Sequence, residues 1–187
     1  MEAVKKISKI EKIVKLIIII IAGTILITIS AKVKIPFYPV PMTMQTFVIL
    51  LIGITLGYKI GLATVALYLF EGIMGLPVFA SSPEKGIGIA YFIGPTMGYL
   101  IGFLIAVFFA GLFKYDKGMI NTFLKLIFSV SFIYILGLIW LGTLIGWDKP
   151  IFKLGAQPFL LAELFKMLLL LFLTPILLKA KKLIKIT

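Results

Sequence analysis

The sequence lacks three residue types that often carry chemistry: cysteine, histidine and arginine. Without cysteine there are no disulfides and no thiolate ligands. Without histidine there is no imidazole metal ligand and no nucleophile–histidine catalysis. Because arginine is also missing, any anion held by a cation meets a lysine ammonium, which is a point charge and not a bidentate fork. We therefore expect no resident metal and no cofactor.

Several enzyme signatures are also missing from the sequence. It contains no Walker A motif, so the chain is not expected to hydrolyse ATP alone. It contains neither G-x-S-x-G nor H-E-x-x-H. Without histidine, acid–base work would fall to Glu163 or Lys166 by themselves. These absences predict that the chain is not an enzyme.

Apolar residues dominate what the sequence does contain. Hydrophobic residues make up 61% of the 187 residues, and the mean hydropathy is +1.19. Several long apolar runs are typical of an integral membrane protein. At roughly 20 residues per span, the chain has room for about six spans with short loops. We therefore predict a single domain, residues 1–187, of the all-α membrane class, with six transmembrane helices at about 14–31, 44–56, 60–74, 95–113, 119–146 and 159–178.

The net charge of +12 comes from lysines that cluster at the two ends and in short loops. This arrangement is the positive-inside pattern of membrane proteins, and it does not indicate a nucleic-acid partner. Most lysines fall on the side of the two termini. Residues 1–15 are interpreted as a cytoplasmic amphipathic lead-in and not as a signal peptide. We predict a multi-pass protein in the lipid bilayer of the bacterial cytoplasmic membrane, with both termini cytoplasmic.

Two opposite charges lie within the last apolar run, at Glu163 and Lys166. Residues three apart share one face of a helix, so the two side chains lie a turn from each other. A charge inside the hydrocarbon layer costs roughly 2.5–3.5 kcal/mol and needs a partner or a water-filled cavity. The pair is therefore a functional-site hypothesis. The alternative is a self-neutralising strut that joins two helices.

Three loops fall on the outer side in this topology, at residues 32–44, 75–94 and 147–158. The first is rich in proline yet apolar, and non-helical backbone at membrane depth is tolerated only against protein or a cavity. Thr43, Gln45 and Thr46 follow with uncharged hydrogen-bonding groups at the cavity edge. The second is rich in glycine and aromatic residues and is long for a plain connector, which suits a loop that closes over a ligand. We predict an outward-facing substrate cavity beneath these loops.

Such a cavity suits a small, partly apolar molecule with a hydrogen-bonding ring and an anionic end. Lys166 would meet the anion, and Glu163 would accept hydrogen bonds or hold Lys166 in place. Threonine, glutamine and serine groups would bond the polar ring, and tyrosine and phenylalanine rings would cover its faces.

Small residues recur at four-residue spacing in several predicted helices. Thr24 and Thr28 form such a pair in the first helix. Glycines repeat the spacing elsewhere, at Gly53, Gly57 and Gly61 and again at Gly94, Gly98 and Gly102. Because small residues let membrane helices approach closely, these positions are predicted to be helix–helix contacts.

Four segments, in this order along the chain, resemble the BioY family. They are IPFYPVPMTMQTF at residues 35–47, GLPVFA at 75–80, GPTMGYLIGF at 94–103 and PFLLAELFK at 158–166. Members of this family are the biotin-specific substrate-binding (S) components of energy-coupling factor (ECF) transporters. The resemblance implies an S-component fold of six transmembrane helices and capture of biotin from outside. It also implies transport driven by a module of a transmembrane coupling protein and two ATPases.

The resemblance also implies roles for individual residues. Glu163 stands where the family usually has Asp, and Lys166 matches the lysine three residues later. The other matching positions are Thr43, Gln45, Phe79, Thr96 and Tyr99, and two further substrate-binding candidates, Ser81 and Tyr91, lie where the family varies. Thr24 and Thr28 stand where the family often has an Ala-x-x-x-Ala pair that docks the coupling protein, so they are the predicted docking residues.

Two other functions remain compatible with the residues. The first is an S component for another small vitamin, such as riboflavin or thiamine, although a lysine in the last helix argues against thiamine, which is a cation. The second is a non-transporting membrane assembly protein in which Glu163 and Lys166 form an internal strut. Loss of stability in a variant of the pair would indicate a strut, and loss of binding alone would indicate a ligand site.

Overall fold

The structure is a computed structural model, and it describes residues 2–35 and 38–183. Pro36, part of the predicted proline-rich loop, and Lys185, part of the basic C-terminal end, lie outside the described residues. The elements occur in the order α1 (Glu2–Lys32), β1 (Lys34–Ile35), β2 (Met42–Thr43), α2 (Gln45–Ile73), α3 (Gly88–Phe92), α4 (Met97–Leu112), α5 (Gly118–Ile145), α6 (Ile151–Gly155), the 3-10 helix η1 (Gln157–Phe159) and α7 (Leu160–Leu183).

Helix α2 consists of two arms that meet at Gly57. This glycine has a φ of 78°, a backbone conformation that favours glycine. A methyl group placed on Gly61 would lie 3.7 Å from Cα of Gly53, whereas eight residues of straight helix span about 12 Å. The arms therefore fold back on each other. Residues 45–56 form the first arm and residues 58–73 form the second.

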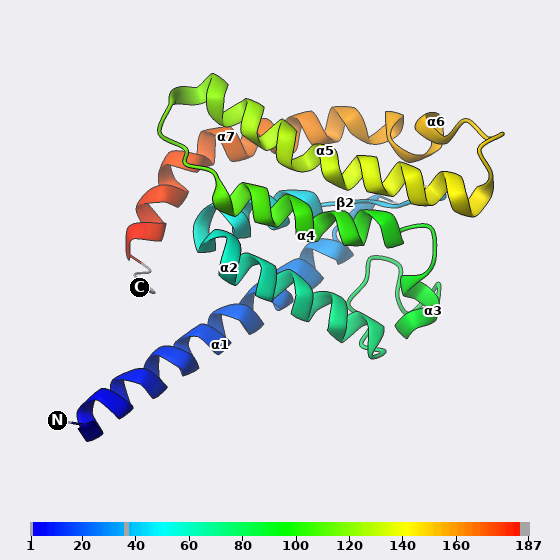
Figure 1. Cartoon of the computed structure of the whole chain (residues 1–187). Helices are drawn as coiled ribbons and strands as arrows, with labels where there is room; N and C mark the ends of the chain where they lie inside the picture. Colours follow the sequence, from blue (N-terminus) through cyan, green and yellow to red (C-terminus); the bar gives the residue numbers. More distant parts are fainter. Residues whose placement is uncertain (1, 36–37, 184–187) are drawn as a thin grey trace.

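The bundle contains six apolar helical segments: α1, the two arms of α2, α4, α5 and α7 (Figure 1). Helices α1 and α5 are each long and apolar enough to cross a membrane, and so is the segment Ile151–Lys179, which contains α6, η1 and most of α7. The two arms of α2 are equally apolar, but they share its 29 residues. Helix α4 is apolar and shorter, with 16 residues. Figure 1 shows both termini at one end of the bundle and α3 and α6 at the other. The predicted all-α fold is confirmed, and the chain is a multi-pass membrane protein.

The elements differ from the predicted boundaries at several places. Helix α1 begins at Glu2, so the lead-in is helical and continuous with the first span. The segment 75–94 was expected to be non-helical but contains α3, and the loop 147–158 contains α6 and η1. Short helices satisfy backbone groups that an irregular loop beside the membrane would leave unpaired.

Helix α4 packs between α2 and α5, and glycines permit this close approach. Any side chain at Gly98 or Gly102 would collide with the backbone of α5, and one at Gly111 would collide with the backbone at Tyr58. Gly53 faces the backbone of α4 at Val107 in the same way. Gly53, Gly98 and Gly102 are thus helix–helix contacts, as their spacing predicts. Gly57 instead forms the kink of α2, and Gly94 precedes α4 and faces the backbone of Tyr91.

The connection from α1 to α2 is closed by a short antiparallel pair of strands, β1 and β2. Lys34 lies opposite Thr43 in this pair. The backbone N–H of Met44 then donates to the carbonyl oxygen of Ser30 at 3.3 Å. The proline-rich segment is thereby folded back against the bundle, where it borders the cavity described next.

Candidate functional site

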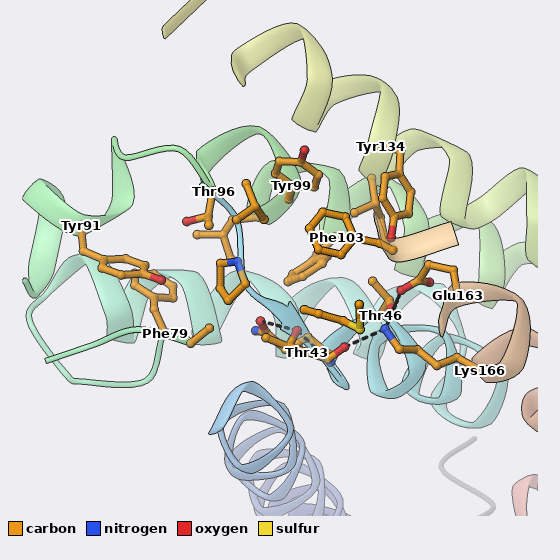
Figure 2. Close-up of a pocket in the computed structure, with 18 residues that line it drawn as sticks. Thr43, Thr46, Phe79, Tyr91, Thr96, Tyr99, Phe103, Tyr134, Glu163 and Lys166 are labelled. Carbon is orange, nitrogen blue, oxygen red and sulfur yellow. Dashed lines mark hydrogen bonds and ion pairs between the residues drawn. The ribbon is translucent and has the colours of Figure 1, made fainter. Parts of the chain in front are cut away.

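A cavity of about 60 Å³ lies inside the bundle, next to α3 and the start of α7 (Figure 2). A single water molecule needs about 10–15 Å³, so a vitamin-sized ligand must widen this space to enter it. Phe79 and Tyr91 lie at one end of the cavity, and Glu163 and Lys166 lie at the other. The remaining wall consists of Val40, Pro41, Met42, Thr43, Gln45, Thr46, Ala80, Thr96, Tyr99, Leu100, Phe103, Ile133, Tyr134 and Phe159.

The charged end of the cavity is built from α7 and the start of α2. Glu163 and Lys166 are only 4% and 8% exposed, and Nζ of Lys166 lies 2.5 Å from Oε1 of Glu163. The same Nζ donates to the carbonyl oxygen of Thr43 at 2.7 Å and to Oγ1 of Thr46 at 3.1 Å. Thr46 in turn donates to Oε1 of Glu163 at 2.8 Å. An ammonium has three N–H donors, so those of Lys166 are all in use.

The second carboxylate oxygen of Glu163, Oε2, is buried and has no hydrogen-bond partner within the described part of the chain. A buried acceptor without a donor costs about 1–3 kcal/mol. The hydroxyl of Tyr134 points toward this carboxylate from α5 (Figure 2). Glu163 also lies in the first turn of α7, where the helix dipole favours negative charge. The site therefore offers an acceptor to a ligand that brings an N–H or O–H group.

Thr43 and Gln45 form a second polar group in the wall. Oγ1 of Thr43 donates to the side-chain oxygen of Gln45 at 3.2 Å and accepts from its backbone N–H at 3.3 Å. Nε2 of Gln45 donates to the hydroxyl of Tyr68 at 2.8 Å, and Tyr68 donates to the carbonyl oxygen of Val78 at 3.2 Å. The Gln45 side chain is thus held in one orientation by Thr43 of β2 and Tyr68 of the second arm of α2.

Phe79 and Tyr91 form the aromatic end of the cavity. Their rings are stacked, with centroids 5.2 Å apart and planes 17° from parallel. Phe79 also meets the ring of Tyr68 at 5.6 Å in an edge-to-face contact. It packs directly on Gly72, where any side chain would overlap its ring. These contacts hold both rings in place where they could cover the apolar faces of a ligand.

Helix α4 supplies Tyr99 and Phe103 to the wall, and Thr96 directly precedes this helix. The hydroxyl of Tyr99 donates to the carbonyl oxygen of Gly155 at 2.8 Å and so links α4 to α6. The Tyr99 ring meets the ring of Tyr134 edge to face at 6.1 Å. Because the Tyr99 hydroxyl is already paired inside the protein, a ligand would meet the ring of Tyr99 and not its O–H.

The predicted substrate-binding residues converge on this one cavity, with Ser81 as the exception. The converging residues are Thr43, Gln45, Phe79, Tyr91, Thr96, Tyr99, Glu163 and Lys166. Ser81 lies outside the wall, and its backbone N–H donates to the hydroxyl of Tyr91 at 3.1 Å. The role of each residue in binding stays a prediction, but the geometry they require is present.

Sequence reasoning left three notable wall residues out of the site: Thr46, Phe103 and Tyr134. Thr46 follows Gln45 directly, and its position beside a polar cavity edge is the available signal. Tyr134 lies in the middle of an apolar helix, where a tyrosine hydroxyl needs a partner, and this need marks it as a candidate. Phe103 resembles any core phenylalanine, so the sequence carries no signal for it.

Thr24, one of the two residues predicted to dock a partner, lies inside the bundle. This residue is 2% exposed, and its hydroxyl lies 3.2 Å from Oε1 of Glu71 on α2. Thr28 is half-buried and donates to the carbonyl oxygen of Thr24 at 2.8 Å. Thr24 thus contacts the second arm of α2, as a small residue in a membrane helix can. Docking of a partner at Thr24 and Thr28 stays a prediction.

The sequence profile of the BioY family matches residues 3–183, which is nearly the whole chain. The chain belongs to the BioY family. It is 37% identical to the "Probable biotin transporter BioY" of Pyrococcus horikoshii, over 75% of this chain and 82% of that protein. It is also 37% identical to the "Biotin transporter BioY" of Thermotoga maritima, over 77% of this chain and 84% of that protein.

A solved structure has the same fold as this BioY chain. The two agree with a TM-score of 0.75 at 26% sequence identity, over 90% of this chain and 93% of that chain. That structure is described as the S-component for biotin from an ECF-type ABC transporter. The S-component fold implied by the family resemblance is therefore confirmed.

Proposed function

We propose that this BioY protein captures biotin from the outer side of the membrane as the substrate-binding component of an ECF-type transporter, and that it is not an enzyme. The observation that carries the proposal is the cavity with the buried Glu163–Lys166 pair at one end and stacked aromatic rings at the other. Ionisable residues inside a membrane bundle mark substrate or ion pathways. The names of the relatives and the solved structure support biotin as the substrate.

The hydrogen-bond pattern at the charged end favours one orientation of biotin. Lys166 has its three donors in use, and Oε2 of Glu163 has no closer donor than the Tyr134 hydroxyl that points toward the carboxylate, so this end of the cavity offers a ligand an acceptor and no free ammonium N–H. The ureido ring of biotin carries N–H groups, whereas its ionised carboxylate only accepts. We therefore place the ureido ring against Glu163 and the carboxylate toward the outer mouth. This reverses the orientation expected from the sequence, in which Lys166 meets the anion.

In this orientation, the remaining wall residues would contact different parts of biotin. The rings of Phe79, Tyr91 and Tyr99 would cover the apolar faces of the ligand. Thr43 and Gln45 would border the polar ring from the side of α2. Buried donors and acceptors that match a ligand exclude analogues that lack the matching groups, which is a physical basis for vitamin specificity.

We place the protein in the cytoplasmic membrane with both termini in the cytoplasm, as one substrate-binding domain. Most lysines of the sequence fall on the side of the two termini, and Figure 1 shows those termini at one end of the bundle. A transmembrane coupling protein and two ATPases would drive import. The need for separate ATPases is supported by the absence of a Walker A motif, the sequence that binds ATP phosphates, from this chain.

A calorimetric titration of the purified protein in detergent tests the proposed function directly. We expect saturable binding of biotin, no binding of thiamine and no ATP hydrolysis by the isolated chain. Thiamine is the matched control because it is a vitamin of similar size with the opposite charge. Binding of thiamine without binding of biotin would contradict the proposal, and ATP turnover by the isolated chain would contradict its role as a component.

The outward face of α1 is the docking surface that we expect for the partner module. Helix α1 packs mainly on α2, and Ala22 is a small residue among the exposed side chains of Ile18, Ile25 and Ile29. Small residues allow close approach of another helix. Replacing Ala22 by tryptophan is therefore expected to reduce biotin uptake by the complete transporter several-fold and to leave biotin binding by the isolated chain unchanged. Unchanged uptake would remove this face from the docking surface.

A further inference from the structure

Two lysines from the outer end of the first span hold the loop at the aromatic end of the cavity. Nζ of Lys32, in the last turn of α1, donates to the carbonyl oxygens of Phe79 at 2.8 Å and Ser82 at 2.6 Å. Nζ of Lys34, in β1, donates to the carbonyl oxygen of Ala80 at 2.7 Å. Three carbonyl groups within four consecutive residues are thus bound by ammonium groups that lie 46 to 50 residues away in the sequence.

Residues 79–82 depend on these bonds because they are buried outside regular secondary structure. Their exposed fractions lie between 1% and 7%. Buried backbone groups need partners, and the N–H groups find them nearby: Ser81 donates to the hydroxyl of Tyr91, and Ser82 donates to the carbonyl oxygen of Phe79. The two lysines donate to the carbonyl oxygens of the loop. Hydrogen bonds from a charged donor are stronger than neutral ones.

The same loop forms part of the cavity wall. Phe79 and Ala80 line the cavity, whereas Lys32 and Lys34 do not. The lysines therefore contact the backbone of the loop without bordering the space that a ligand would fill. Because a vitamin-sized ligand must widen the cavity to enter, movement of this loop away from the bundle would break the lysine bonds.

We propose that Lys32 and Lys34 latch the loop 79–82 over the cavity and so set how fast biotin enters and leaves; this inference rests on the proposed biotin-binding function. Both lysines are positioning residues, since they act through the loop. A latch that is closed with and without ligand slows entry and exit alike. Its removal accelerates both rates and leaves the Kd nearly unchanged. A lysine that contacts the ligand would instead alter mainly the dissociation rate and the Kd.

Stopped-flow binding of biotin to the purified protein tests the latch. The double variant Lys32→Met/Lys34→Met keeps long unbranched side chains and removes the donors. We expect its association and dissociation rate constants to rise at least about tenfold, with a Kd within about threefold of the wild type, because each charged hydrogen bond contributes to the barrier. The conservative variant Lys32→Arg keeps a charged donor and is expected to behave like the wild type.

Lys85→Met is the matched control for the charge at the cavity mouth. Lys85 lies in the same connection between α2 and α3, but its Nζ faces the ring of Tyr38 at 5.9 Å. This variant is expected to accelerate neither rate. If Lys85→Met accelerates association and dissociation as much as the double variant does, loss of surface charge explains the effect and the latch is overturned. Unchanged rates in the double variant, or faster dissociation with a weakened Kd and no faster association, would also overturn it.

Hydrogen exchange on the ligand-free protein separates the latch from the proposed function. The double variant is expected to exchange the backbone amides of residues 80–82, 84 and 85 at least about tenfold faster than the wild type, with α4 unchanged, because local opening becomes easier. If the loop exchanges faster in the double variant but the wild-type protein binds no biotin, the latch is supported and the proposed biotin-binding function is refuted. If the wild-type protein binds biotin but the loop of the double variant exchanges as slowly as that of the wild type, the function is supported and the latch is refuted.

Discussion

Replacing Lys166 by alanine is expected to weaken biotin binding by at least about tenfold. The change leaves Glu163 buried without its cation, and removing one partner of a buried ion pair typically costs about 3–5 kcal/mol. Thr43 and Thr46 also lose the donor that holds them around the cavity. The helix contacts of the bundle are otherwise unchanged, so we expect the variant to stay monodisperse in detergent. Calorimetric titration and size-exclusion chromatography measure the two outcomes.

The double variant Glu163→Gln/Lys166→Met distinguishes a ligand site from a strut. Both new side chains are uncharged and close in size to the originals, so no unpaired charge remains buried. If the pair is a strut, the melting temperature of the double variant returns from that of the Lys166→Ala variant to that of the wild type, and biotin binding is kept. If Glu163 is the acceptor for the ligand, the melting temperature recovers while biotin binding stays weak. Recovery of full affinity would contradict the site that we propose.

Replacing Gly98 by valine is expected to lower the melting temperature by roughly 6–12 °C, because about 3 kcal/mol of overpacking corresponds to such a shift in a chain of this size. A side chain at Gly98 would overlap the carbonyl oxygen of Leu136 and Cβ of Trp140 on α5. Backbone atoms cannot rotate away as a flexible side chain can. Since Tyr99 on α4 and Tyr134 on α5 both line the cavity, separation of these helices is also expected to weaken biotin binding. Differential scanning fluorimetry in detergent measures the shift.

Ala22→Val is the control for the glycine variant. It adds a β-branched residue to a membrane-spanning helix at an exposed position, with no backbone beside it to meet. We expect its melting temperature to stay within about 2 °C of the wild type, as is usual for surface substitutions. An equal loss in both variants would show that β-branching, and not the close approach of α4 to α5, causes the effect.

The charged end of the site is the part that the sequence predicts most directly. Glu163 and Lys166 are conspicuous because they interrupt an apolar run, and their spacing alone places them on one face of a helix. Partners from other helices are not visible in this way. Thr46 meets Glu163 across 117 residues, and Tyr134 reaches the same carboxylate from α5. Which faces of two helices meet depends on packing that no local pattern encodes.

Thr24 also shows that a local pattern does not identify the helix that it contacts. A small-residue pair predicts a helix contact, but it does not say whether the other helix belongs to the same chain or to a partner. In the structure, Thr24 is buried beside Glu71 of the same chain. Ser81 is similar: its position in a glycine-rich, aromatic loop suggests a ligand contact, but it lies outside the cavity wall and its backbone N–H bonds Tyr91.

The sequence by itself determined the membrane class, the number of spans, the glycine contacts and the charged pair of this BioY protein. Each follows from residues close together in the chain: apolar runs, four-residue spacing and a charge inside a helix. The tertiary structure alone decided which oxygen of Glu163 is unpaired, which way Thr24 faces and which carbonyl groups Lys32 and Lys34 bind. These features depend on contacts between residues tens of positions apart, and such contacts exist only once the helices have packed.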